Sequence, residues 1–284
     1  MTSLALGLVL LSAVIHATWN LLTKRAIADT PFLWLVYVVG AIVYAPLAIG
    51  ILLLAKPALG PIALVFVAVA VVLQTVYFTT LSAGYRAGDL SLVYPLARAT
   101  GPLLATLGAI TLFGERPTAV ALAGAVAILA GALVLTGDPR ALGADRRAVG
   151  FAVATGVVIA LYTLWDKTAV SLLLIPPLLY DWSTVVGQAI VVAPSALRDG
   201  ARLRETWVRR RGAVIAVGIL SRLSYILVLT ALVVSPVSYV APAREIGILF
   251  GALMGARLLA EGHPLRRGMG AAAMVAGIVA LAVG

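Results

Sequence analysis

The sequence predicts an all-α integral membrane protein whose ten transmembrane helices form two inverted five-helix repeats. Of its 284 residues, 62% are hydrophobic and 11% are charged, whereas a soluble domain is about half apolar and about a quarter charged. A spanning helix needs about 20 residues, so the chain has room for roughly ten of them joined by short loops. The third observation is an internal repeat, in which motifs of the first half return in the second.

Ten apolar segments of about 20 residues account for almost the whole chain. Their apolar residues do not alternate with polar ones, so helices are predicted. Pro, Gly and charged residues mark the boundaries. The predicted spans are residues 4–22, 32–54, 62–82, 90–113, 118–136, 149–165, 172–195, 212–234, 237–259 and 268–283. Two polar segments, Arg198–Arg211 and Gly137–Arg147, are interpreted as surface loops.

The repeat is clearest when the sequence is shifted by 146 residues. Arg98 then falls on Arg244 and Glu115 falls on Glu261, while several glycines and alanines also coincide. The predicted units are residues 1–138 and 147–284, joined by a connecting loop at 139–146. Because five is odd, two successive five-helix units enter the bilayer in opposite orientations, an arrangement typical of transporters. The paired Glu115 and Glu261 are expected to have a structural role at a turn.

Three strings resemble a known family. HATWNLLTKRA, YPLARATGPLLATLGAITLFGERPT and APAREIGILFGALMGARLLAEG are similar to the EamA-type family of the drug/metabolite transporter superfamily, in the matching halves. The resemblance covers nearly the whole chain. It implies a ten-helix secondary carrier with a central cavity shared by both halves, which moves small metabolites or drugs across the cell (cytoplasmic) inner membrane. It implies no particular substrate.

Charged residues inside the predicted spans are the first candidates for a site. A charge at the bilayer centre costs roughly 2.5 to 3.5 kcal/mol on insertion scales, so such residues should face a cavity or a partner. The six candidates are Arg98, Arg222, Arg244, Arg257, Asp181 and Glu245.

Arg98 and Arg244 lie at matching depths in the two halves. Two guanidinium groups placed in this way can bind a carboxylate or a phosphate bidentately. The alternative is that Glu245 or Asp181 neutralises Arg244, that helix-end carbonyls satisfy Arg98, and that these residues serve packing.

A proline precedes each of these arginines, Pro95 in one half and Pro242 in the other. Each removes a hydrogen bond to the carbonyl four residues earlier, at Ser91 and Ser238. Broken helices at repeat-related positions indicate a binding site in carriers, although either proline alone could be a simple kink.

Polar and aromatic side chains on neighbouring faces complete the predicted lining of the site. The predicted substrate-binding residues are Arg98, Arg244, Glu245, Ser91, Tyr94, Ser238, Trp19, Asn20, Tyr77, Arg222 and Tyr225. His16, the one histidine inside a predicted span, is a candidate for proton coupling because its charge can change near neutral pH. A hydrogen-bonded packing histidine is the alternative.

The sequence therefore predicts a secondary transporter, independent of ATP, that moves a small anionic or zwitterionic metabolite by alternating access. The classes considered are amino acids, organic acids and phosphorylated compounds. Two alternatives stay open: a membrane-embedded enzyme acting on a lipid-linked substrate, and a flippase of lipid-linked sugars. We find no enzyme motif, nucleotide motif or metal-spaced cluster, so we expect no catalytic residue, no cofactor and no bound metal.

The net charge of +10 is explained by orientation in an anionic membrane rather than by nucleic acid, since the basic residues lie mostly between the spans. The expected partners are a small-molecule substrate and the lipid bilayer, with a homodimer left open. Fourteen Lys and Arg residues lie in the loops on the side reached after the first span, against three on the other. The positive-inside rule then places both termini outside, whereas the family resemblance implies that they are inside.

Overall fold

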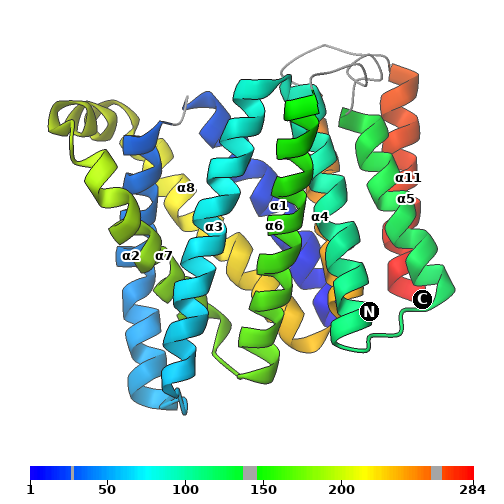
Figure 1. The fold of residues 1–284 in the computed structure, drawn as a ribbon, viewed down its shortest axis with the longest axis horizontal. Coiled ribbons are helices and arrows are strands. Elements are labelled where there is room, and N and C mark those ends of the chain that lie inside the picture. The colour runs from blue at the N-terminus through cyan, green and yellow to red at the C-terminus, as the bar shows by residue number, and fades with distance from the viewer. Residues whose placement is uncertain (27–28, 137–145, 257–263) are drawn as a thin grey trace.

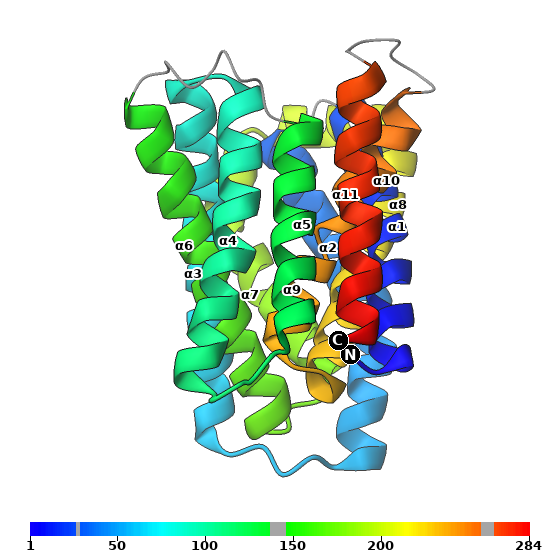
Figure 2. The ribbon, with the colours of Figure 1, turned by 90° about the vertical axis from the view of Figure 1, so that its right-hand side faces the viewer.

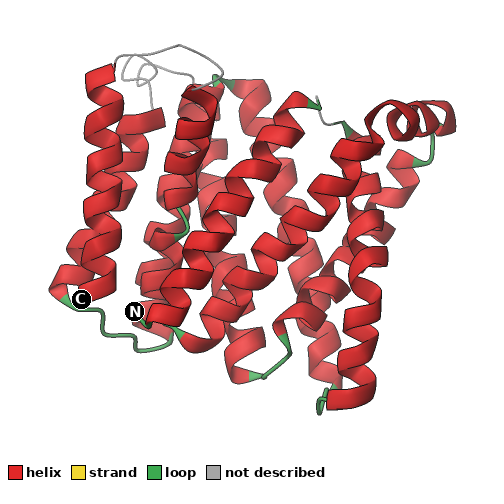
Figure 3. Ribbon diagram, turned by 180° about the vertical axis from the view of Figure 1, so that it is seen from behind, coloured by secondary structure: helices red, strands yellow, loops and turns green. Residues whose placement is uncertain are grey.

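The structure, a computed structural model, describes residues 1–26, 29–136, 146–256 and 264–284. Every regular element among them is helical (Figures 1 and 3). The helices are α1 (Ser3–Arg25), α2 (Thr30–Gly50), α3 (Pro61–Ala87), α4 (Leu90–Leu112), α5 (Ala119–Thr136), α6 (Arg146–Lys167), α7 (Pro177–Ala196), α8 (Gly200–Val234), α9 (Val237–Ala243), α10 (Ile246–Ala256) and α11 (Pro264–Val283). Short π-helical turns, Ile51–Ala55 and Thr168–Leu172, extend α2 and α6.

Local sequence explains where several helices begin. The Thr2 hydroxyl accepts a hydrogen bond from the Ala5 amide at 3.2 Å, and the Asp29 carboxylate accepts one from the Phe32 amide at 3.1 Å. Asp199 caps α8 in the same way, through the Arg202 amide at 2.9 Å. These side chains satisfy backbone donors that have no partner within the helix.

Among the described residues, six helical segments are long and apolar enough to cross a membrane, with α9 and α10 counted together as one. They are Ser3–Arg25, Thr30–Ala55, Pro61–Ala87, Arg146–Leu172, Gly200–Val234 and Val237–Met254. Two further apolar helices, Ala119–Leu135 and Gly268–Val283, are shorter. The remaining two predicted spans correspond to α4 and α7, whose sequences contain internal prolines and buried polar side chains. The prediction of an all-helical integral membrane protein is thus supported.

Two sequence expectations need correction. The segment Arg198–Arg211 is not a loop, because α8 begins at Gly200 and continues through it. Arg is a good helix former, and the Asp199 cap starts the helix before the apolar part is reached. The predicted span 237–259 is interrupted, since α9 ends at Ala243 and α10 begins at Ile246. Residues 137–145 and 257–263, including Arg257 and Glu261, lie outside the described residues.

Helices from the two halves of the chain pack against one another throughout the bundle. In Figure 1, α2 and α7 lie at one end and α5 and α11 at the other. Between them α1 packs on α8 and α10, α6 packs on α3 and α4, and α4 meets α9. Figure 2 shows α5 and α11 side by side, with α9 behind them. Each predicted unit therefore builds its core largely from helices of the other.

The pair α5 and α11 is packed closely through glycines. A Cβ added at Gly124 would lie 2.7 Å from the carbonyl oxygen of Gly277, and one added at Gly277 would lie 2.6 Å from that of Gly124. Gly131 and Gly270 show the same reciprocal contact, at 2.7 and 2.8 Å. Small residues let helix backbones approach in this way in membranes, where apolar side chains gain little by leaving lipid.

Candidate substrate site

The break between α9 and α10 has a local cause in the sequence. Pro242 has no amide hydrogen, so it cannot donate to the Ser238 carbonyl as the fourth residue of a regular turn would. The two residues after α9, Arg244 and Glu245, form a turn in which the Glu245 amide bonds the Pro242 carbonyl at 3.1 Å. The chain then resumes a helical course at Ile246. Two charged side chains are thus presented at an interruption inside the bundle.

The start of α9 is held by a carboxylate from the first half of the chain. The two oxygens of Glu115 accept hydrogen bonds from the Val237 amide at 2.8 Å and the Ser238 amide at 2.9 Å. A carboxylate is stabilised at a helix N-terminus by the free amides and by the helix dipole. These contacts support the structural role at a turn that was expected for Glu115. Ser238 itself is buried, 1% exposed.

An ion pair joins the helix break to α4. Nε of Arg98 lies 2.8 Å from Oε2 of Glu245, and the two side chains are 10% and 4% exposed. The alternative interpretation of the sequence pairs Arg244 with Glu245 or Asp181. In the structure Glu245 pairs with Arg98 and Asp181 with Arg222.

Arg244 is the other guanidinium at the break. It lies over the ring of Tyr225, 5.7 Å from the ring centroid, which is within the range of a cation–π contact. Arg244 is partly exposed. Within the described part of the chain it makes no ion pair with a carboxylate. Its charge is therefore the least compensated of the three guanidinium groups described inside the bundle.

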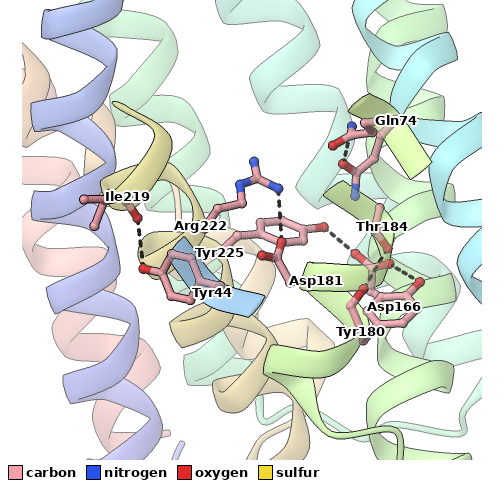
Figure 4. A network of polar contacts seen from close by, with 10 residues as sticks. Tyr44, Gln74, Asp166, Tyr180, Asp181, Thr184, Ile219, Arg222 and Tyr225 are labelled. Carbon is pink, nitrogen blue, oxygen red and sulfur yellow. Dashed lines mark hydrogen bonds and ion pairs between the residues drawn. The ribbon is translucent and has the colours of Figure 1, made fainter. Parts of the chain in front are cut away.

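A buried carboxylate, Asp166, lies at the hydroxyl end of Tyr225 (Figure 4). The hydroxyl of Tyr225 donates a short hydrogen bond to one oxygen of Asp166, and the hydroxyl of Tyr180 donates to the other at 2.8 Å. Asp166 is 1% exposed. Two neutral hydroxyls are its direct partners, so this carboxylate keeps its charge uncompensated by a direct ion pair among the described residues.

A second ion pair lies beside this carboxylate. Nη1 of Arg222 is 3.1 Å from Oδ1 of Asp181, with side chains 14% and 2% exposed. Figure 4 shows this pair between Tyr44 and the Asp166 cluster. Tyr44 donates to the Ile219 carbonyl at 3.0 Å. Arg222, a predicted substrate-binding residue, is thus already paired.

Tyrosines surround Arg98. Its guanidinium carbon lies 6.0 Å from the centroid of the Tyr94 ring. Tyr77 and Tyr162 are also within electrostatic range of it, and their rings meet edge to face with centroids 6.0 Å apart. The predicted residues Tyr77 and Tyr94 are therefore neighbours of Arg98, and Tyr162 joins them.

Of the predicted residues of α1, His16 adjoins the two arginines, whereas Trp19 and Asn20 have other contacts. His16 is within electrostatic range of both Arg98 and Arg244, so it adjoins the site. Trp19 meets the His16 ring edge to face at 4.8 Å, but it also packs on the apolar cluster formed by α2 and α8. Asn20 donates to the His16 carbonyl at 2.9 Å, which occupies its amide within its own helix.

Ser91 lies in the first turn of α4, and its side chain is not among those described.

Several polar residues of this region are not among the predicted substrate-binding residues, although Asp181 was a candidate as a charge within a predicted span. They are Gln74, Tyr162, Asp166, Tyr180, Asp181 and Gln188. Gln188 donates to Gln74 at 2.8 Å across α7 and α3. A usable signal was present, because Tyr162 and Asp166 are four residues apart on one helix face, and Asp181 is a charge within an apolar segment.

The arrangement can hold a solute that carries charge. It offers Arg244, which makes no ion pair with a described carboxylate, and Asp166, whose hydrogen-bond partners among the described residues are two tyrosine hydroxyls. Tyrosine rings lie between and around these two charges. No group of three or more His, Cys, Asp or Glu residues suited to a metal ion occurs among the described residues. Recognition by charge and by hydrogen bonding is the chemistry that these side chains offer.

Comparisons with known proteins agree with the fold and the early motifs. One solved structure, described only as "Crystal structure of protein", is 18% identical and matches 100% of this chain and 98% of its own with a TM-score of 0.75. At this identity the likeness shows a shared fold alone. No curated protein matches the chain. Residues 3–137 match the sequence model of the EamA-like transporter family, which confirms the resemblance that the motifs indicated. The segment 3–137 is thus similar to the EamA-like transporter family.

Proposed function

We propose that this protein is a secondary transporter of the cytoplasmic membrane that moves a small anionic or zwitterionic metabolite by alternating access. An amino acid, an organic acid or a phosphorylated compound would fit. The observation that carries the proposal is Arg244, a partly exposed guanidinium at a helix break, with no ion-pair partner among the described carboxylates. A charge in that position is expensive unless it has a function or a ligand.

Ten spans arranged as two inverted repeats are part of the proposal. Helix packing supports it: the pairing of α3 with α6 has its counterpart in α8 with α1, and that of α4 with α6 has its counterpart in α10 with α1. In Figure 1, α1 starts at the lower end of the bundle and α6 at the upper end, so the first helices of the two units run in opposite directions. The reciprocal glycine contacts of α5 and α11 fit the same two-fold relation.

In the proposed site, Arg244 binds the carboxylate or phosphate of the substrate bidentately. Asp166 receives the ammonium group of a zwitterion, which replaces the tyrosine hydroxyls that hold it in the structure. Arg98 and Glu245 anchor the break to the other half of the chain. A purely anionic substrate would bind Arg244 without using Asp166. Dependence on Asp166 therefore distinguishes zwitterionic from anionic substrates.

Alternating access would use the interruption between α9 and α10. Two charged residues in a turn, one of them paired across the halves, allow the short helix α9 to move relative to α10 without breaking a continuous helix. His16, next to both arginines, is proposed as the group through which a proton gradient acts.

Uptake by purified protein in liposomes tests the proposal. Labelled amino acids, organic acids, organic phosphates and sugars are offered with and without a pH gradient. Arg244→Gln should lower uptake of the transported solute by roughly 10- to 100-fold, the effect of losing charge-assisted hydrogen bonds. Arg25→Gln, at an exposed arginine at the end of α1, is the matched control.

Wild-type uptake by Arg244→Gln would exclude the proposed role of this residue. Transport of neutral sugars alone would contradict the substrate class.

A further inference from the structure

The helix α8 is longer than the hydrocarbon core of a bilayer is thick. The helix has 35 residues and would be about 52 Å long if straight, whereas the hydrocarbon core of a bilayer is about 30 Å thick. In Figure 1 the first turns of α8, here called its extension, lie at the upper left, near the end of α7 and the start of α2. Arg202 approaches Asp29, the cap of α2, at 3.5 Å, which agrees with this position.

One face of this extension is basic and apolar at the same time. Arg204, Trp207, Val208 and Arg211 are spaced by three, one and three residues, so they share one helix face. All four are exposed, Trp207 by 40% and Val208 by 64%.

Carboxylates neutralise other arginines of the extension. Arg202 pairs with Asp29, and Arg209 lies 3.2 Å from Glu205. Neither Arg204 nor Arg211 makes an ion pair with any described residue.

An exposed tryptophan and valine between two uncompensated arginines suit the surface of a bilayer. Tryptophan favours the headgroup level, where its ring is partly in the apolar phase. Arginine binds phosphate oxygens bidentately, and helices with this composition lie in the interface and favour anionic lipids. A protein partner is less well matched, because this end of the bundle also carries Lys24, Arg25 and Arg86, as expected of a membrane-facing rim.

We propose that Arg204, Trp207, Val208 and Arg211 form a surface site for the phosphate headgroup of an anionic phospholipid in the adjacent leaflet. The two arginines contact phosphate oxygens, and Trp207 and Val208 insert at the boundary between headgroups and acyl chains. The leaflet next to this end of the bundle is then the anionic one, a conclusion independent of the transported substrate.

Lipid quenching of Trp207 tests the site. The full-length protein is placed in nanodiscs of phosphatidylcholine with a minor fraction of phosphatidylglycerol, and one or the other lipid is brominated at the same mole fraction. Subtracting the signal of Trp207→Phe isolates this tryptophan. We expect quenching by brominated phosphatidylglycerol to exceed that by brominated phosphatidylcholine about fivefold, and the excess to fall as salt is added.

The variant Arg204→Gln/Arg211→Gln should lose this excess, while Arg209→Gln, which removes an arginine paired with Glu205, should retain it. Unchanged thermal unfolding of the variants shows that the bundle is intact. Equal quenching by both lipids in the wild type overturns the proposal, as does an excess that survives the double substitution. Were the double variant to misfold, the salt series on the wild type would decide alone.

Discussion

The helix α4 and the pair α9 and α10 occupy equivalent places in the sequence repeat but differ in structure. Both contain Ala-Arg preceded closely by proline. Yet α4 runs unbroken from Leu90 to Leu112, whereas its counterpart is interrupted at Arg244 and Glu245. Proline alone therefore does not break the helix in this protein. The two segments differ in sequence in the position of the proline, three residues before Arg98 but two before Arg244, and in the residue after the arginine.

That residue is Ala99 in the first half and Glu245 in the second. Glu245 pairs with Arg98 of the opposite half. The equivalent pair would join Arg244 to position 99, where alanine has no charge. Glu245 thus pairs with only one of the two arginines, and in the proposed site this asymmetry leaves Arg244 available for a substrate.

The largest expected effect comes from breaking the ion pair. Arg98→Gln or Glu245→Gln should each destabilise the protein by about 3–5 kcal/mol, because the remaining charge is left buried without its partner. The double variant should recover most of this loss, since neither charge remains. Thermal unfolding in detergent measures the effect, with Arg209→Gln as the exposed control. A double variant no more stable than the singles would show that the pair is not the cause.

Moving the carboxylate to the other half sharpens the comparison. Glu245→Ala combined with Ala99→Glu should regain about 1–2 kcal/mol relative to Glu245→Ala alone, because the new carboxylate can pair with Arg244. Uptake by the variant with Ala99→Glu should be lower than that by the uncharged control, since Arg244 is then engaged. Glu245→Ala with Ala99→Gln is the uncharged control in the same unfolding and uptake measurements. Equal stability of these two double variants would contradict the two-fold relation.

The second comparison concerns the glycines of α5 and α11. Gly131→Ala should destabilise by about 1–3 kcal/mol, because the new Cβ would lie 2.7 Å from the Gly270 carbonyl oxygen. Gly150→Ala, where nothing lies within 4 Å, should be neutral or slightly stabilising. Thermal unfolding of both variants checks this. Similar losses at both sites would mean that the close approach is not essential.

The smallest effect is expected at two lysines near the ends of α1 and α6, Lys24 and Lys167. Nζ of Lys167 donates to the carbonyls of Leu232 at 2.6 Å and Ser235 at 3.1 Å, at the end of α8. Lys24 is exposed at the end of α1. Lys167→Met should cost about 1 kcal/mol, and Lys24→Met less than about 0.5 kcal/mol. A lower melting temperature for the Lys24 variant than for the Lys167 variant would contradict the greater contribution of Lys167 to stability.

The site was partly visible in the sequence. Arg98 and Arg244 were found because a charge within an apolar run is unfavourable in lipid and therefore conspicuous. Asp166 shares a helix face with Tyr162 that the sequence predicts to line the cavity, but it was not included among the predicted binding residues. Its partners Tyr180 and Tyr225 come from two other helices, and no spacing along the chain relates them to it.

By itself the sequence determined that the chain is helical and of a composition suited to a membrane, where most of the predicted helices lie, and that its first half resembles a transporter family. These properties follow from composition, from the length of apolar runs and from short motifs, all of which are local. Only the tertiary structure decided which carboxylate neutralises which arginine, and that α9 ends where it does. Ion pairs between the halves depend on how separate helices pack, because side chains 147 residues apart, such as Arg98 and Glu245, become neighbours only after the bundle has formed.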